Sequence, residues 1–312
     1  AGTYTNNGQQ TIKTDTGMKL TELLSGIETL QRAGAPETDI TSLGFDSRHA
    51  TAGQLFFAVK GSASDGHDYM AQATANGAAA VVCERLPEEP FPGVAYIVVA
   101  DSSAALGTIA SRFYGEPSHK LKLVGVTGTN GKTTTATLLY DLFRRLGYKA
   151  GLISTVVYRI DNETLPSTHT TPDAIRLNAM LAEMAERGCD YCFMEVSSHS
   201  IVQERIAGLT FAGGIFTNIT HEHLDYHGTF AEYIRAKKRF FDRLPKGAFA
   251  LVNTDDRNGA VMVQNSAATT YTYALRSFSD FRCRILENTP EGMLLELDGQ
   301  QVWTRFLGRV NA

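Results

Sequence analysis

Apolar and polar positions in the second part of the chain alternate between strand-like and helix-like periods. Apolar runs of strand length occur at residues 122–127, 150–154, 191–196, 214–219 and 248–253. Amphipathic stretches of helix length separate them, at 132–146, 172–187 and 229–243. Thr171-Pro172 and a capping box over 229–232 mark two of the helix starts. This alternation is typical of a mostly parallel sheet with helices on both faces, and it predicts an α/β fold.

The regions on either side of this pattern contain shorter elements. We expect helices at 20–27, 71–80 and 104–114, and strands at 55–59, 79–83 and 96–100. They indicate a small α/β domain over residues 18–120, which ends in the polar stretch around Pro117. Strand-like runs at 270–274, 281–286, 293–297 and 301–306 predict a small antiparallel extension of the second domain, residues 121–312.

Composition agrees with a folded chain of about two domains, because 312 residues with 43% hydrophobic and 20% charged residues are usual for globular proteins. A formal net charge of -4 provides no basic field, so no nucleic acid or membrane partner is expected. No apolar run approaches the roughly 18 residues needed to cross a bilayer. We interpret residues 1–17, rich in Thr, Asn, Gln and Gly, as a tag-like or disordered arm, with Met18 as a natural start.

Four cysteines at uneven spacing indicate a reducing, cytoplasmic location rather than a disulfide scaffold. Cys189 and Cys192 form a C-x-x-C sequence, but no second pair follows it. We therefore interpret them as two buried thiols, with a redox or zinc role as the alternative.

A glycine-rich loop lies between a predicted strand and a predicted helix. Its residues are Gly128, Thr129, Asn130, Gly131, Lys132, Thr133 and Thr134. Backbone N–H groups at such a helix start bind phosphate oxygens. The core G-K-T of a phosphate-binding loop is intact, although Val126 stands where the full pattern has its first glycine. We expect Lys132 to contact the β- and γ-phosphates and the Thr133 hydroxyl to hold Mg²⁺.

Lys237 occupies an unusual position in the helix predicted at 229–243. It lies among the members of that helix's apolar stripe, which are Phe230, Tyr233, Ile234, Phe240, Phe241 and Leu244. Lys237 is therefore expected to point toward the core. Burial lowers the pKa of a lysine from about 10.4, and the neutral amine can react with CO₂ to give a carbamate, which is a metal-binding anion. The residues alone leave open a purely structural lysine whose amine reaches solvent.

Two further segments carry candidate metal ligands. Glu195 ends a predicted strand, and a carboxylate at the carboxyl end of a strand in an open sheet lies where ligands and Mg²⁺ bind. The loop 218–227 follows the next strand and contains three histidines. We expect one of them near a magnesium–phosphate site, with a structural zinc site as the alternative. A zinc-protease motif fails, because Asp225 stands where H-E-x-x-H requires its second histidine.

A serine-hydrolase interpretation of Ser197 and His199 is not supported either. The two residues are almost adjacent, and the chain has no G-x-S-x-G elbow.

Five motifs, taken in order, resemble those of the Mur ligase family. They are residues 128–134, Glu195-Val196-Ser197-Ser198-His199, Gln203-x-Arg205, His223-Leu224-Asp225-Tyr226-His227-Gly228 and Tyr233-x-x-Ala236-Lys237. The resemblance extends from about Met18 to the end of the chain. It implies that the glycine-rich loop binds ATP and that Thr133, Glu195 and His223 bind two Mg²⁺ ions. It also implies that Lys237 is carbamylated and helps to hold the second ion, so that Lys132, His223 and Lys237 carry the catalytic roles.

The resemblance further implies a nucleotide-sugar substrate, UDP-N-acetylmuramoyl-L-alanyl-D-glutamate. The residues that correspond to its ligands are Ser47, His169, Thr170, Thr171, Ser197, Gln203 and Arg205. His169 stands where some family members have asparagine. The resemblance assigns residues 18–120 to binding of the UDP-linked substrate and residues 121–312 to binding of ATP.

The implied reaction is an ATP-dependent amide ligation of peptidoglycan precursor synthesis. The substrate's glutamate carboxylate becomes an acyl phosphate, which the amine of meso-diaminopimelate or L-lysine attacks. Family members continue with a third domain that holds this amino acid, and the chain ends about where that domain should begin. We therefore expect a monomer that binds the UDP-linked substrate and ATP but does not ligate alone. The alternatives are a P-loop NTPase or phosphotransferase, a ligase like folylpolyglutamate synthase, and a non-catalytic binding module.

Overall fold

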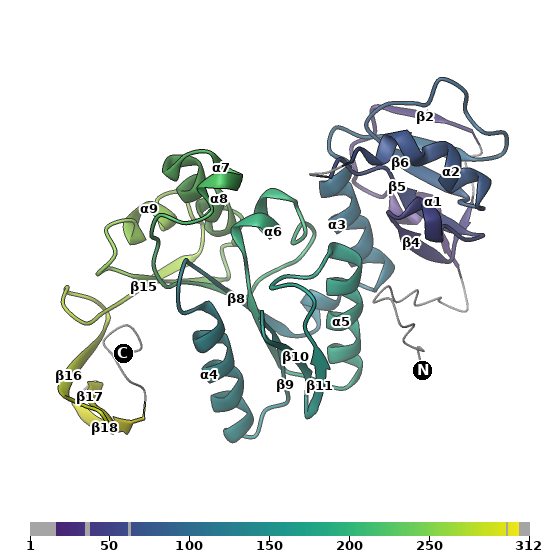
Figure 1. The fold of residues 1–312 in the computed structure, drawn as a ribbon. Helices are drawn as coiled ribbons and strands as arrows, with labels where there is room; N and C mark the ends of the chain where they lie inside the picture. The colour runs from purple at the N-terminus through teal and green to yellow at the C-terminus, as the bar shows by residue number, and fades with distance from the viewer. Residues whose placement is uncertain (1–16, 35–37, 62–63, 298, 306–312) are drawn as a thin grey trace. The chain divides into compact units, whose positions relative to one another are not determined.

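The computed structural model describes residues 17–34, 38–61, 64–297 and 299–305, which form two compact units (Figure 1). The first unit contains the chain up to Pro117 together with Pro172–Glu183 and Gln203–Leu209. The second contains Ser118–Thr171, Met184–Val202 and the chain from Thr210 onward. The arm expected at residues 1–17 lies outside the described residues except for Gly17. The assignment of 18–120 and 121–312 to two separate domains stays a prediction.

A five-stranded sheet forms the centre of the first unit. Its strands lie in the order β2 (Gln31–Ala33), β7 (Ala95–Val98), β6 (Ala80–Cys83), β5 (Gln54–Phe57) and β4 (Ser42–Gly44), and only β2 is antiparallel to its neighbour. Both faces of this sheet are buried, since Leu55 and Phe57 belong to one hydrophobic cluster and Phe56 belongs to another. The remaining elements are α1 (Leu20–Leu23), α2 (Met70–Ala75), α3 (Ser102–Phe113) and the antiparallel pair β1 (Met18–Lys19) and β3 (Asp39–Ile40).

The second unit is built on an eleven-stranded sheet with β8 (Lys122–Thr127) near its middle. Seven neighbouring strands are parallel: β9 (Ala150–Ile153), β12 (Tyr191–Glu195), β8, β13 (Gly213–Phe216), β14 (Phe249–Asn253), β15 (Thr269–Ala274) and β16 (Phe281–Thr289). Antiparallel strands complete both edges, β10 (Val157–Ile160) and β11 (Glu163–Pro166) at one, β17 (Gly292–Leu297) and β18 (Gln300–Thr304) at the other. The mostly parallel α/β fold predicted from the periodicity is confirmed.

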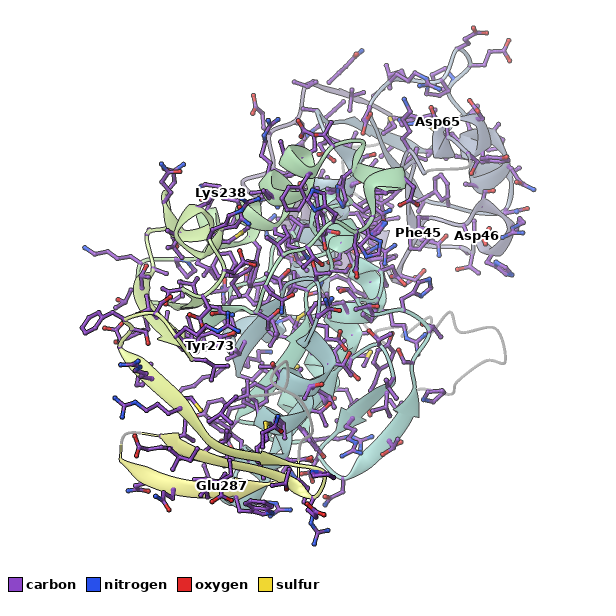
Figure 2. All side chains as sticks on the ribbon, turned by 60° about the vertical axis from the view of Figure 1, so that its left-hand side comes forward. Phe45, Asp46, Asp65, Lys238, Tyr273 and Glu287 are labelled. Atoms are coloured by element: carbon purple, nitrogen blue, oxygen red, sulfur yellow. The ribbon has the colours of Figure 1, made fainter. Side chains whose placement is uncertain are left out.

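Two details of the predicted sheet are wrong. The run at 270–274 was expected in the antiparallel extension, yet β15 pairs in parallel with β14 and β16. The antiparallel pairs begin only beyond β16, a strand that bulges between Ile285 and Glu287; Glu287 is labelled in Figure 2. The β10–β11 hairpin was not predicted at all, because its strands are four residues long, β10 has only two buried residues and β11 has none. Short edge strands of this kind carry little hydrophobic signal.

Helices cover both faces of the central strands. Val124 and Val126 of β8 pack in one cluster with Ala136 and Tyr140 of α4 (Lys132–Arg145). Successive side chains of a strand point to opposite faces. Gly125 accordingly lies on the other face, where a Cβ would meet the ring of Phe240 at 2.6 Å, and this ring belongs to α8 (Phe230–Asp242).

The remaining helices are α5 (Ala174–Glu186), most of which belongs to the first unit, and three shorter helices of the second unit. The shorter helices are α6 (Ser198–Val202), α7 (Leu224–His227) and α9 (Gly259–Val263). None of the helices in the described part of the chain is long and apolar enough to cross a membrane.

The contact between Gly125 and Phe240 gives a first prediction. Gly125→Ala is expected to lower the free energy of unfolding by about 1–3 kcal/mol, because the buried ring also packs edge-to-face on Phe211 and cannot move aside freely. Urea unfolding of the native chain and the variant measures this difference. Gly247→Ala is the control, since a Cβ at Gly247 has open space around it. Equal losses in both variants would contradict the packing argument.

Candidate functional site

The glycine-rich loop connects β8 to α4 in a conformation that two glycines permit. Gly131 precedes the first residue of α4 with φ 85°, and Gly128 has φ 151°. Both values lie where residues with a Cβ are strained. A Cβ on Gly128 would also collide with the hydroxyl of Thr217. The loop therefore passes close to the end of β13, and its shape depends on both glycines.

Side chains that follow β13 fix the middle of this loop. The carbonyl of Asn130 accepts from Thr217 Oγ1 at 2.7 Å and from Asn218 Nδ2 at 3.1 Å. Its N–H donates to Asn218 Oδ1 at 3.0 Å. Thr129 Oγ1 lies 3.2 Å from the hydroxyl of Tyr233. These contacts hold the loop between β13 and α8.

Lys132 turns its side chain back over its own loop. Its Nζ donates to the carbonyls of Gly128 and Thr129, at 3.0 and 2.8 Å. Burial lowers the pKa of Lys132, although the nearby carboxylates of Glu195 and Glu222 oppose this shift. An anion that arrived at the loop would stabilise the ammonium form and favour the protonated lysine.

Glu195 collects three hydrogen bonds at the carboxyl end of β12. Its Oε1 accepts from Thr133 Oγ1 at 2.8 Å and from the N–H of Thr155 at 2.7 Å, and its Oε2 accepts from Thr155 Oγ1 at 3.1 Å. A carboxylate can accept about four hydrogen bonds, two on each oxygen, so Oε2 of Glu195 can bind one more donor or a metal ion. A buried carboxylate beside the hydroxyl of a phosphate-binding loop fits Mg²⁺, which is commonly bound by one or two protein oxygens together with phosphate oxygens.

Lys237 lies beneath the loop, as the apolar stripe of its helix predicted. Its side chain is 1% exposed, and Nζ donates to the carbonyl of Gly128 at 2.8 Å. The ammonium nitrogen also lies 4.8 Å from the centre of the Tyr233 ring. Burial lowers the pKa of Lys237 well below its usual value, and the charge of Lys132 lowers it further. The buried position is confirmed, and it favours the neutral, CO₂-reactive amine.

His223 belongs to a group of aromatic and imidazole rings above α8. Its ring centre lies 5.0 Å from that of His199 and 6.0 Å from that of Tyr233. His223 is exposed and has φ 56°, which is uncommon for a residue with a Cβ. His227 lies in the same group and its Nε2 is 2.9 Å from Ser198 Oγ. His223 and the amine of Lys237 thus both lie near the ring of Tyr233.

The candidate metal ligands do not form a closed cage. Among the residues that the structure describes, no three His, Cys, Asp or Glu side chains gather to hold a metal ion. Thr133 and Glu195 are brought together, and their oxygens fit one Mg²⁺ that phosphate oxygens and water would complete. His223 and Lys237 fit a second ion only if the Lys237 amine is converted to a carbamate, because an ammonium group does not bind cations.

The candidate substrate ligands fall into two groups. Thr170 Oγ1 lies 3.0 Å from Thr155 Oγ1, and Thr171 Oγ1 donates to the backbone carbonyl of Glu195 at 2.8 Å. The N–H of Ser197 donates to Thr171 Oγ1 at 3.3 Å, and the backbone of His169 is held by the hydroxyl of Tyr158. Thr171 thus contacts the backbone of Glu195 directly, Ser197 and Thr170 lie one contact further away through Thr171 and Thr155, and His169 precedes Thr170 in the same loop.

Ser47, Gln203 and Arg205 belong to the first unit. Ser47 is buried and donates to Gln72 Oε1 at 2.7 Å, while Arg205 donates through Nε and a terminal nitrogen to Gln203 Oε1, at 2.9 and 2.6 Å.

Several residues that shape this site were given no role from the sequence, although Asn218 lies in the loop 218–227 and Tyr233 in the Tyr233-x-x-Ala236-Lys237 motif. Thr155 follows β9, Thr217 and Asn218 follow β13, and Tyr233 lies on α8. The first three stand at carboxyl ends of parallel strands, where side chains line the ligand edge of an open sheet. That rule identified Glu195 and could have identified these residues as well.

The two cysteines of the C-x-x-C sequence are buried free thiols, as interpreted. Burial raises the pKa of both thiols, which makes them poor nucleophiles and metal ligands.

Known proteins with similar sequences share both units of the chain. The family model described as Mur ligase middle domain matches residues 126–312, and the model described as Mur ligase family, catalytic domain, matches residues 39–114. The UDP-N-acetylmuramoyl-L-alanyl-D-glutamate--2,6-diaminopimelate ligase of Bacteroides thetaiotaomicron is 55% identical over 295 residues, which cover 95% of this chain and 61% of that protein. The protein of the same name from Geobacillus thermodenitrificans is 42% identical over 290 residues, covering 90% of this chain and 58% of its own length. The chain thus spans about three fifths of the length of these relatives.

Solved structures give the same result for the fold. A structure of a UDP-N-acetylmuramoyl-L-alanyl-D-glutamate--2,6-diaminopimelate ligase matches with a TM-score of 0.81 at 26% identity, covering 95% of this chain and 61% of that one. A D-alanyl-D-alanyl-adding ligase from Acinetobacter baumannii shares the fold, with a TM-score of 0.60 at 22% identity.

Proposed function

This chain belongs to the Mur ligase family, and on that basis we propose that it binds ATP and UDP-N-acetylmuramoyl-L-alanyl-D-glutamate for an amide ligation of peptidoglycan precursor synthesis. The incoming amino acid that we propose is 2,6-diaminopimelate, because the similar curated proteins are named for it. The observation that carries the proposal is the hydrogen bond between Thr133, in a glycine-rich loop at a helix start, and the buried carboxylate of Glu195.

The proposed reaction has two steps. In the first, a carboxylate oxygen of the substrate's D-glutamate attacks the γ-phosphorus of ATP, and the bond to the β-phosphate oxygen breaks to release ADP. In the second, the amine nitrogen of the amino acid attacks the acyl phosphate carbon, inorganic phosphate leaves, and the amine loses a proton. Both steps bring anions together, so the site must supply positive charge.

The residues of the second unit suit this demand. The free N–H groups at the start of α4 and the ammonium of Lys132 would hold the transferred phosphoryl group as charge moves onto it. Thr133 and Glu195 would hold Mg²⁺, which supplies Lewis-acid stabilisation of phosphate oxygens when bound. A carbamate on Lys237 would replace an unfavourable buried cation with an anionic group. This group and His223 would then hold a second Mg²⁺.

The candidate substrate ligands are assigned in two groups. We assign Thr170, Thr171, Ser197 and His169 to the dipeptide end of the substrate, because Thr171 contacts Glu195 and Thr170 contacts Thr155, which is bonded to Glu195. Ser47, Gln203 and Arg205 of the first unit are assigned to the rest of the UDP-linked molecule.

Calorimetric titration of the 312-residue chain with a non-hydrolysable ATP analogue tests this proposal. Binding is expected to be much tighter in Mg²⁺ than in EDTA. Thr133→Val is expected to weaken it about 10- to 100-fold in Mg²⁺ but little in EDTA, because the variant keeps the loop and loses one metal-ligating oxygen. Thr137→Val, which changes a half-buried threonine of α4 beyond the loop, is the matched control. Mg²⁺-independent binding would contradict the metal assignment. ATP hydrolysis that does not respond to UDP-N-acetylmuramoyl-L-alanyl-D-glutamate would favour a P-loop NTPase instead.

A further inference from the structure

Thr155 is the second residue after β9, and it touches both halves of the proposed site. Its N–H donates to Glu195 Oε1 at 2.7 Å, and its hydroxyl oxygen lies 3.1 Å from Glu195 Oε2. The same hydroxyl oxygen lies 3.0 Å from Thr170 Oγ1. One side chain thus stands between the carboxylate assigned to the metal and a threonine assigned to the UDP-linked substrate.

The direction of these two hydrogen bonds follows from the number of protons. A hydroxyl group carries one proton, whereas a carboxylate oxygen can only accept. Thr155 must therefore donate to Glu195, and Thr170 must donate to Thr155. Because the hydroxyl proton of Thr170 is used in the hydrogen bond to Thr155, the Thr170 oxygen can serve a ligand only as an acceptor, from an N–H or O–H group.

Other contacts hold the same loop without reaching the carboxylate. Ser167 Oγ donates to the carbonyl of Ser154 at 2.9 Å, and the hydroxyl of Tyr158 donates to the carbonyl of His169 at 2.5 Å. These bonds fix the position of residues 167–170 against the β9–β10 turn. Loss of one of them would loosen the loop but would leave the contact between Thr155 and Glu195 in place.

We propose that Thr155 is a positioning residue that makes the binding of Mg²⁺-nucleotide and of the UDP-linked substrate cooperative, by passing the orientation of the Glu195 carboxylate to the hydroxyl of Thr170. This inference rests on the proposed function, because it takes Glu195 to serve the nucleotide and Thr170 to serve the substrate. A ligand that fixes the carboxylate also fixes the proton of Thr155, and thereby presents Thr170 as an acceptor. The reciprocal effect follows, since binding free energies of two linked ligands are coupled equally in both directions.

Calorimetry on the 312-residue chain tests this coupling. The dissociation constant of UDP-N-acetylmuramoyl-L-alanyl-D-glutamate is measured with and without a saturating Mg²⁺ complex of a non-hydrolysable ATP analogue. In the native chain the nucleotide is expected to tighten substrate binding about 5- to 150-fold. Thr155→Val keeps the shape and the backbone bond to Glu195, and it is expected to reduce this factor to nearly one. Thr155→Ser restores the hydroxyl and is expected to restore the coupling.

Ser167→Ala is the matched control, because it removes a bond of the same loop that does not reach Glu195. It is expected to weaken substrate binding by the same factor with and without nucleotide, so that the coupling remains. Thr170→Val interrupts the contact from its other end and is expected to abolish the coupling too, which keeps the test decisive if Thr155→Val does not fold.

Undiminished coupling in Thr155→Val or Thr170→Val would overturn the inference, as would an equal loss of coupling in Ser167→Ala. A native chain that binds both ligands independently would overturn the inference and leave the proposed function standing. A native chain that binds neither ligand would overturn both.

Discussion

Lys237→Met is expected to make the chain more stable at neutral pH, by about 1–3 kcal/mol in the free energy of unfolding, although it removes the most unusual group of the site. The amine is buried beneath the loop, where its ammonium form is penalised, and water solvates the ammonium far better in the unfolded chain. Methionine has a similar length and suits an apolar environment. The carbonyl of Gly128 loses Lys237 but keeps Lys132 as a partner. Chemical denaturation in CO₂-free buffer measures the difference.

The stabilisation is expected to shrink as the pH rises. The pKa of Lys237 is lowered in the folded chain, so between this lowered pKa and about 10.5 the unfolded state binds more protons than the folded state. The contribution of Lys237 to the free energy of unfolding of the native chain therefore rises with pH in that window, by up to about 1.4 kcal/mol per pH unit. The variant lacks this contribution. The difference between the two proteins should fall between pH 7 and pH 10, and a constant difference would mean that Lys237 stays charged in the fold.

Lys238→Met is the control for both effects. Lys238 is the next residue of α8, and its ammonium pairs with Asp242 at 2.5 Å. Its replacement is expected to change stability little or unfavourably, with no gain at neutral pH. In bicarbonate buffer the intact mass of the native chain and of Lys238→Met should include a CO₂ adduct, and that of Lys237→Met should not. An adduct that persists in Lys237→Met would assign the carbamate to another amine.

Lys132→Met is expected to weaken binding of the Mg²⁺ complex of ATP about 10- to 150-fold. The variant loses a charge-assisted contact to phosphate, and such contacts contribute about 1.5–3 kcal/mol. Because burial lowers the pKa of Lys132, affinity in the native chain should also fall as the pH rises through that lowered value, where the ammonium form is lost. The affinity of Lys132→Met should lack this alkaline decline. Calorimetric titrations between pH 7 and pH 10 measure both effects.

Lys149→Met provides the matched loss of one positive charge. Lys149 is exposed and donates to the carbonyl of Arg187, so its replacement is expected to leave ATP binding within about twofold of the native value. Equal weakening in the two variants would attribute the effect to net charge rather than to the loop.

Sequence periodicity predicted the parts of this fold that bury continuous apolar runs. The strand at 122–127 was expected with the bounds that β8 has, because every residue after Lys122 is buried and apolar or small. The direction of β15 could not be predicted in the same way. Whether a strand pairs in parallel depends on what connects it to its neighbour, and the segment after β14 contains only the short helix α9, whose start has no side-chain cap.

In the candidate site, too, features that depend on neighbouring residues were predictable, and contacts between distant residues were not. The burial of Lys237 was predictable, since helical spacing alone places it among Tyr233 and Phe240. Its bond to Gly128 was not, because 109 positions separate the two residues. Thr155 and Glu195 likewise lie at the same edge of the sheet only because the strand order places β9 beside β12. Roles that arise from strand order need the three-dimensional fold.

The way β13 holds Asn130 affects how the glycine-rich loop can meet a ligand. The N–H of Asn130 and its carbonyl belong to the two peptide groups on either side of its Cα, and both are already bonded to the side chains of Thr217 and Asn218. Neither peptide group can therefore turn toward a phosphate without losing these bonds. The amides that remain for an anion are those of the following residues at the start of α4, which have no partner within the helix. The loop thus loses its conformational freedom when the chain folds rather than when nucleotide arrives. Nucleotide binding to such a preorganised loop carries a smaller entropic penalty, and it should proceed with little rearrangement of residues 128–131.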